Sequence, residues 1–213
     1  MKVRGIYKKY KIILNLQEHM LRVTKVALFI GDHWQGGEID WELIKKAALL
    51  HDLGNIVKFK MKEYPDFLGE EKKRLDYWLR VQKEMIRKYG EDDHQATRKM
   101  LEDARIGSNI LAIIMAKSFH NAVEIDNFDN WPLKILFYSD LRVGPFGIIS
   151  LKERLGEVIP RLKMYRESDH LDKLVKATYQ IEKQIQKNLD VNVSEITERS
   201  IERDDKELLK TEV

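Results

Sequence analysis

The sequence predicts an all-α protein. Apolar residues recur at spacings of three and four along most of the 213 residues, as expected of helices with one buried face. The chain has only four prolines, and no stretch shows the strict alternation of a half-buried strand. The expected helices are, in order, 11–32, 40–51, 69–89, 92–104, 108–120, 132–140, 151–166 and 169–189.

Residues at several of these helix ends have side chains suited to the position. Asp40 is placed to cap the start of the second expected helix, and Gly54 is placed to end it. Ser150 and Glu153 have the spacing of a capping box before a helix. Pro132 suits a first helical turn, where no amide hydrogen is needed. These signals support the helical prediction independently of the apolar periodicity.

The length of the chain suits one domain, alone or with an appendage. Residues 1–167 are expected to form the domain, with an inserted helical segment at about 56–92. Residues 168–213 are expected to form a C-terminal helix and a charged tail. The helix has a single apolar stripe, which would pack on the domain or on another copy of the chain in a homo-oligomer. The tail after Leu189 is expected to be weakly packed.

Composition restricts the classes of function. Lys and Arg number 38 against 35 Asp and Glu, and this balance, without a basic stripe, argues against nucleic-acid binding. No apolar run is long enough for a membrane helix and no signal peptide is visible, so a cytoplasmic location is expected. Because the chain has no cysteine, any metal ion must be bound by imidazole and carboxylate groups.

Four histidines and two aspartates lie in positions that suggest metal ligation. His51 and Asp52 close an apolar helix, and two consecutive residues can reach one centre only near a helix end. Asp140 shares a helix face with apolar residues, where an unpaired carboxylate would be costly and a bound cation would offset that cost. The candidate ligands are His19, His51, Asp52, His94, His120 and Asp140.

Each candidate alone has a simpler explanation. A single histidine on an apolar face is usually a hydrogen-bonded core residue, and a single buried aspartate is usually a cap or an ion-pair partner. The ordered set on successive helices is the observation that favours a metal site. His33 and His170 lack this context and are expected at the surface.

The order His, His-Asp, His, His, Asp resembles the HD-domain superfamily of metal-dependent phosphohydrolases. The stretch AALLHDLGN at 47–55 looks like the signature helix and turn of that superfamily, and LFYSDLRVG at 136–144 looks like the segment with its final aspartate. The resemblance covers roughly residues 17–147 and implies an orthogonal helical bundle around the metal site. The ligands that it implies are His19, His51 and Asp140 for a first ion and His94 and His120 for a second, with Asp52 as the bridge.

The reaction implied by the resemblance is hydrolysis of a phosphate ester or anhydride by metal-activated water. The cofactor would be divalent metal, with two ions chosen from Fe, Mn, Zn, Ni or Mg, and the substrate a nucleotide or a related small phosphorylated molecule. Lys58, Lys117 and Arg142 lie near the metal positions in sequence and are candidates to bind the phosphoryl oxygens, Arg142 by a forked contact. A solvated surface cation is the alternative for each. Asp52 and these three cations are the expected catalytic residues.

The sequence departs from two branches of the superfamily. Position 55 is Asn, where cyclic-dinucleotide phosphodiesterases usually have Lys and mononuclear nucleotidases often have Glu. No glycine precedes Tyr64 and Pro65, so the Gly-Tyr-Pro signature of those phosphodiesterases is missing. The same ligand order is seen in di-iron oxygenases resembling inositol oxygenase, and a non-catalytic module that binds metal or nucleotide is a third alternative.

Overall fold

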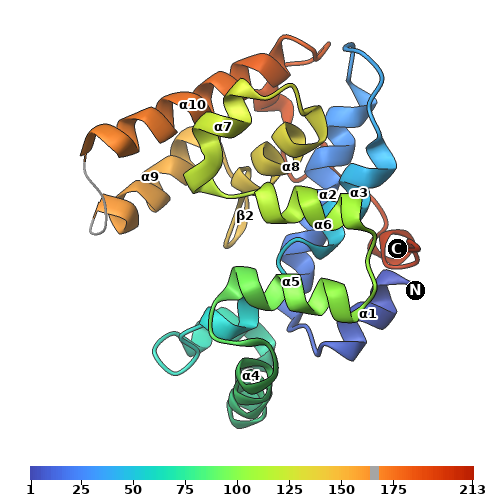
Figure 1. Ribbon diagram of the computed structural model, residues 1–213, viewed down its shortest axis with the longest axis vertical. Helices are drawn as coiled ribbons and strands as arrows, with labels where there is room; N and C mark the ends of the chain where they lie inside the picture. The colour runs from blue at the N-terminus through green and yellow to red at the C-terminus, as the bar shows by residue number, and fades with distance from the viewer. Residues whose placement is uncertain (164–167) are drawn as a thin grey trace. The chain divides into compact units, whose positions relative to one another are not determined.

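The computed structural model describes residues 1–163 and 168–213, and this part of the chain is predominantly helical (Figure 1). Its one sheet has two short antiparallel strands, β1 (Val143–Gly144) and β2 (Gly147–Ile148), with Val143 opposite Ile148. The prediction of an all-α fold is confirmed. None of the described helices is long and apolar enough to span a membrane.

The chain forms two compact units, each assembled from separate stretches. Unit 1 consists of Met1–Leu21, Leu49–Met115 and Asp204–Val213, and unit 2 of Arg22–Ala48 and Ala116–Arg203. The domain boundary predicted after residue 167 falls at residues 164–167, which lie outside the described residues, and it stays a prediction.

Unit 1 is built around helices that pack on the segment predicted as an insertion. Its elements are α1 (Val3–Lys9), the start of α2 (Leu14–Asp32), the end of α3 (Trp41–Leu50), the 3₁₀ helices η1 (Asn55–Lys58) and η2 (Pro65–Arg74), α4 (Leu75–Tyr89), α5 (Asp93–Asp103), nearly all of α6 (Ser108–Ala116) and α11 (Asp205–Leu208). Helix α4 packs on α5, η1 and η2. The Gln82 amide donates hydrogen bonds of 2.7 Å to the carbonyls of Ile56 and Phe59, which ties η1 to α4.

Unit 2 is organised by one long helix, α10 (Ser168–Gln186), which packs along α7, α8 and α9 (Figure 1). Its other elements are the remainder of α2 and α3, η3 (Phe119–Asn121), α7 (Ala122–Asn127), α8 (Trp131–Leu141), α9 (Leu151–Lys163) and η4 (Val193–Glu195). The apolar stripe of α10, from Leu171 to Ile185, is buried within this unit. The stripe therefore packs on the protein itself, which was one of its two predicted partners.

The structure confirms two predicted helix caps and corrects several predicted boundaries. The helix expected from residue 11 begins at Leu14, and the helix expected from residue 69 begins at Leu75. Asp40 accepts a hydrogen bond from the amide of Leu43, and Ser150 and Glu153 cap each other reciprocally. Helix α6 ends at Ala116 instead of continuing to residue 120, and the predicted end at residue 166 lies outside the described residues. Helix α1 was not predicted. It has only seven residues, and Lys11, with φ of 51°, separates it from the helix that follows.

The prediction of a weakly packed C-terminal tail is wrong. Ile196, Ile201 and Leu208 are all buried, although charged residues surround them in the sequence. Within unit 1, the amides of Val3 and Arg4 donate hydrogen bonds of 3.0 Å to carbonyls of residues 211 and 209. A few well-spaced apolar side chains are thus sufficient to order a segment whose average composition indicates disorder.

Candidate metal centre

The His51-Asp52 pair lies in a tight turn immediately after α3. Helix α3 ends at Leu50, one residue before the predicted end, and the chain passes through residues 51–54 into η1. The hydroxyl of Tyr7 donates a 2.7 Å hydrogen bond to the carbonyl of Leu49, which anchors the end of α3 to α1. The His51 side chain is buried, and the Asp52 side chain is 17% exposed. Because the residues leave the helix here, two neighbours can point toward the same centre.

Gly54 is needed in this turn for a reason that the sequence did not predict. Its φ of −83° is right-handed, so it is not the left-handed helix cap that was expected. A Cβ atom at this position would lie 2.4 Å from the amide nitrogen of Thr97 and 2.6 Å from the carbonyl oxygen of Asp93, both on α5. The Gly54 amide also donates a 2.9 Å hydrogen bond to the Thr97 hydroxyl. Helix α5 therefore rests directly on the turn that carries His51 and Asp52.

Replacing Gly54 with alanine should destabilise the protein by about 2–3 kcal/mol, because the added methyl group meets backbone atoms that cannot rotate away. Urea denaturation followed by circular dichroism would measure the change. The matched control is Gly156→Ala in α9, where a Cβ would meet no atom of the described residues within 4 Å and alanine favours the helix. Equal stabilities of the two variants would contradict the proposed role of Gly54.

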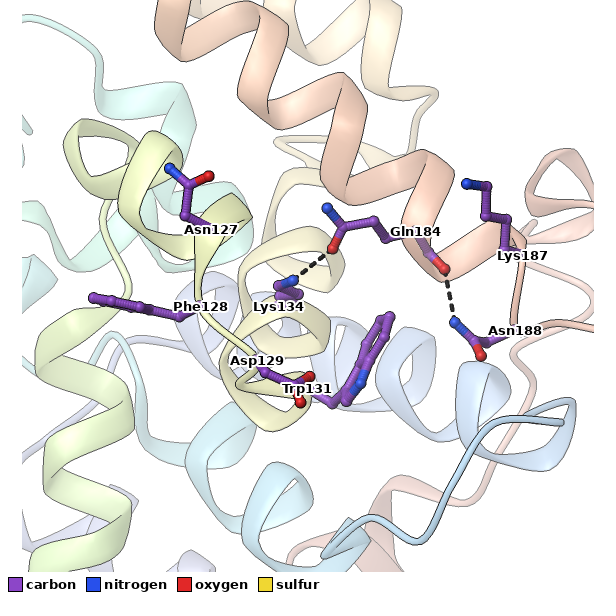
Figure 2. Close-up of a pocket in the computed structure, with 8 residues that line it drawn as sticks. All are labelled: Asn127, Phe128, Asp129, Trp131, Lys134, Gln184, Lys187 and Asn188. Carbon is purple, nitrogen blue, oxygen red and sulfur yellow. Dashed lines mark hydrogen bonds between the residues drawn. The ribbon is translucent and has the colours of Figure 1, made fainter.

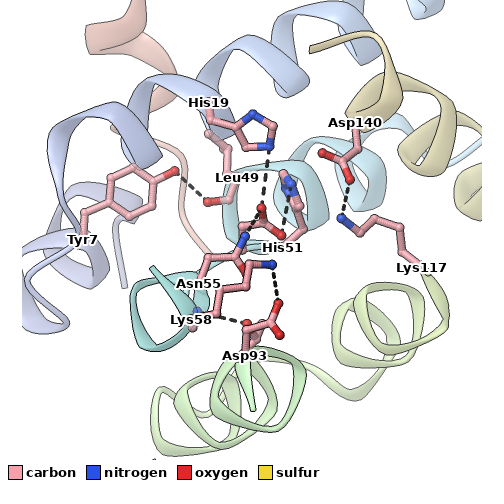
Figure 3. A network of polar contacts seen from close by, with 12 residues as sticks. Tyr7, His19, Leu49, His51, Asn55, Lys58, Asp93, Lys117 and Asp140 are labelled. Atoms are coloured by element: carbon pink, nitrogen blue, oxygen red, sulfur yellow. Dashed lines mark hydrogen bonds and ion pairs between the residues drawn. The ribbon is translucent and has the colours of Figure 1, made fainter. Parts of the chain in front are cut away.

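His19, on α2, joins His51 and Asp52 to form a group of possible metal ligands in unit 1 (Figure 3). Nε2 of His19 lies 3.6 Å from Oδ2 of Asp52, and Nε2 of His51 lies 3.5 Å from Oδ1. These distances exceed those of ordinary hydrogen bonds. They are near the separation of about 3.3 Å between two ligands on one tetrahedral ion with bonds of 2.0–2.1 Å. Two imidazoles and a carboxylate in this arrangement fit a divalent transition-metal ion.

Asn55 is a member of this site that the sequence analysis did not identify. Its side chain is buried, and its amide nitrogen donates a 2.5 Å hydrogen bond to Oδ2 of Asp52. A hydrogen bond of this kind fixes the orientation of a ligand carboxylate, as partners of metal ligands commonly do. The available signal was the spacing, because residues three apart in a turn can contact each other.

Asp140 lies on α8 in unit 2, and its carboxylate is paired with a lysine. Lys117 donates a 2.6 Å hydrogen bond to Oδ2 of Asp140, and the two side chains are 12% and 21% exposed. The ion pair is therefore partly shielded from water, which strengthens it relative to a surface pair. Both residues were predicted as site residues from the sequence, and the pair is drawn in Figure 3.

Comparison with known protein families gives one match, which covers residues 16–207 and is the HD domain. The chain belongs to the HD domain family. No curated protein matches the chain, and no solved structure matches it either. The family match extends well beyond residues 17–147, on which the resemblance was based, so both units contribute to the HD domain.

Two of the candidate ligands in this HD domain are exposed. His94 lies in the first turn of α5, and His120 lies in η3. Neither belongs to a group of three or more converging ligand side chains in the part of the chain that the structure describes. The structure therefore gives no support to a second ion bound by these two histidines. His170 is also exposed, as predicted, whereas the His33 side chain is only 31% exposed and contacts Asp190.

Lys58, a candidate to bind phosphoryl oxygens, is on η1 and forms an ion pair within unit 1. Its ammonium lies 2.5 Å from Oδ2 of Asp93, and its side chain is half exposed. Because such exposed pairs contribute little free energy, the ammonium can exchange its partner for a ligand at small cost.

The structure corrects the role predicted for Arg142. Its side chain is buried, with 4% exposed, and the guanidinium donates hydrogen bonds of 2.7–3.1 Å to three backbone carbonyls and to the hydroxyl of Tyr138. The three carbonyls belong to Ile149, Val193 and Ile196. The guanidinium is therefore committed to the backbone of unit 2. The sequence does not reveal which cations are buried. For that reason the sequence analysis expected the Arg142 guanidinium to bind phosphoryl oxygens at the metal positions.

Proposed function

We propose that this HD-domain protein is a metal-dependent phosphohydrolase that acts on a small phosphorylated molecule, such as a nucleotide. The observation that carries the proposal is the group formed by His19, His51 and Asp52, which has donor atoms of the right chemistry at separations that suit one ion. Membership of the HD domain family supports the choice of a phosphate ester or anhydride as substrate.

We propose Asp140 as the fourth ligand. Its support is the resemblance of residues 136–144 to the segment that carries the final aspartate of HD domains, together with the incomplete exposure of its side chain. A bound ion of Mn, Fe, Ni, Zn or Mg would supply Lewis acidity and lower the pKa of a coordinated water. His94 and His120, the expected ligands of a second ion, are exposed, and we therefore propose a site for one ion.

The protein's own residues would prepare the site in distinct ways. Asn55 would hold the Asp52 carboxylate in one orientation through its hydrogen bond to Oδ2. The Lys58 ammonium, on a half-exposed side chain, would bind a phosphoryl oxygen after leaving Asp93. Lys117 would neutralise Asp140 before substrate enters and could then supply a second cation for the phosphate.

The test combines metal analysis with a panel of substrates. Protein purified with and without oxygen would be analysed for bound metal and assayed with phosphomonoesters, nucleotides and phosphodiesters. We expect phosphate release with one or more of these substrates, loss of activity on chelation, and recovery with Mn, Mg, Zn or Ni without dioxygen. Iron-dependent oxygen uptake without phosphate release would establish the oxygenase alternative. Bound metal without turnover of any substrate would indicate a binding module.

A further inference from the structure

A pocket lies within unit 2, at the start of α8 and the end of α10 (Figure 2). Its volume is about 330 Å³, which is at the lower end of the range for small-molecule sites. The residues that line it include none of the proposed metal ligands and none of the predicted phosphate-binding cations. The pocket is therefore formed by residues other than those of the proposed hydrolytic site.

The floor of this pocket contains a buried cation. Lys134 is 5% exposed, and burial lowers the pKa of its ammonium while the carboxylates of Asp126 and Asp129 oppose that shift. In the described chain, its ammonium forms one hydrogen bond, of 2.5 Å, to the neutral side-chain oxygen of Gln184. No carboxylate of the described residues is within ion-pair distance of it. An ammonium has three N–H donors, so its capacity for hydrogen bonds is not filled.

The neutral side chain of Gln184 cannot balance the positive charge of Lys134. Its side-chain nitrogen donates a 2.6 Å hydrogen bond to Oδ1 of Asp126, which fixes the amide with its oxygen toward Lys134. Figure 2 shows this oxygen facing the ammonium. Since a buried charge is stable only when paired or well solvated by hydrogen bonds, an anion is the natural additional partner.

The walls of the pocket add an apolar and aromatic surface. Trp131 lies one helical turn before Lys134, whose ammonium is 5.2 Å from the centre of its ring. Trp34 packs edge-on against Trp131 with ring centres 4.9 Å apart, which holds the indole in place. Phe128 also lines the pocket, and its side chain is 60% exposed.

We propose that this pocket binds a small aromatic anion, with its carboxylate or phosphate group on Lys134 and its ring against Trp131. Lys187, also in the lining, adds positive charge, so that the pocket carries a net charge of +1 from two lysines and Asp129. The side-chain amide of Asn188, held by a 2.9 Å hydrogen bond to the carbonyl of Gln184, is a further polar group beside the ring. A ligand needs both parts, because the ammonium selects the charge and the indole selects the flat ring.

The experiment uses probes that separate the two parts of the ligand. Binding of benzoate and phenyl phosphate to the full chain would be followed by saturation-transfer NMR and tryptophan fluorescence, with inorganic phosphate and benzyl alcohol as probes that lack the ring and the charge. All titrations contain EDTA, so that no probe is held by a metal ion. We expect benzoate and phenyl phosphate to bind at least tenfold more tightly than the other two. Equal binding of all four probes, or no binding of the aromatic anions, would overturn the proposal.

Variants of the pocket locate the binding. Lys134→Met should weaken benzoate binding about tenfold or more, because a hydrogen-bonded charge pair is lost. Lys176→Met, on the exposed face of α10, is the matched control and should bind as the wild type does. If Lys134→Met does not fold by circular dichroism, Trp131→Ala replaces it and should weaken binding comparably. Wild-type affinity in a folded pocket variant would disprove the site.

Discussion

Replacing Asp52 with alanine should abolish metal binding together with metal-dependent hydrolysis. The substitution removes the carboxylate that lies 3.5–3.6 Å from the imidazoles of both His19 and His51. We expect the metal content to fall to background and the rate of phosphate release to fall at least about 100-fold, since even loss of a partner outside the ligand set can cost 10–100-fold. Mass spectrometry of the metals and a phosphate assay would measure both quantities.

The control for this variant is Asp76→Ala, which removes an exposed carboxylate from the first turn of α4 in the same unit. It should keep the metal content and activity of the wild type. Asp76→Ala should unfold near the wild-type urea concentration, whereas Asp52→Ala should unfold at a somewhat lower one, because it removes the acceptor of the buried Asn55 amide. Circular dichroism would check that Asp52→Ala is folded. Full metal content in Asp52→Ala would refute the assignment of this carboxylate as a ligand.

Replacing Arg142 with methionine should have the largest effect on stability. Methionine retains the apolar stem but removes the donor to the carbonyls of Ile149 and Ile196 in a buried environment. The Val193 carbonyl loses one of its two donors and keeps the amide of Ile196. It also removes the donor to Tyr138, whose hydroxyl itself donates to Glu182 on α10. Several unsatisfied buried acceptors together should lower the free energy of unfolding by roughly 3–5 kcal/mol. Thermal and urea denaturation would measure this.

Arg199→Met provides the comparison, because Arg199 is exposed in the same C-terminal segment and should be replaceable at little cost. The two hypotheses for Arg142 predict different results. A structural role lowers stability, and whatever protein remains folded keeps its affinity for substrate. A stable Arg142→Met protein with a raised KM would instead return the arginine to the phosphate-binding role that the sequence predicted.

Periodicity was sufficient to predict the fold, because the burial of one helix face leaves a regular trace in the sequence. The His51-Asp52 turn was also predictable, since two adjacent polar residues at the end of an apolar helix need a common partner. The role of Gly54 was not, because its constraint comes from α5, some 40 residues later, and not from its own backbone angles. Long-range contacts of this kind have no local signature.

The same limitation explains the outcome for the predicted cations. Lys58 and Arg142 both lie near metal positions in sequence, and nothing in their immediate neighbours distinguishes an exposed lysine from a buried arginine. The burial of Arg142 depends on carbonyls of residues 193 and 196, in a segment whose charged composition predicted weak packing. The two errors therefore have one origin, since the tail is ordered partly by the arginine that it covers.

The place of residues 193–211 in the two units has a consequence for how the protein is made. During synthesis on the ribosome, the helix that carries Asp140 is made about 50 residues before the carbonyl that accepts a hydrogen bond from Arg142. Helix α1 is made about 200 residues before residues 209 and 211, whose carbonyls accept hydrogen bonds from its amides. Helices can form early, but closing such long loops is slow and keeps apolar surface accessible meanwhile. The nascent chain should therefore depend on chaperones more than its helical content suggests.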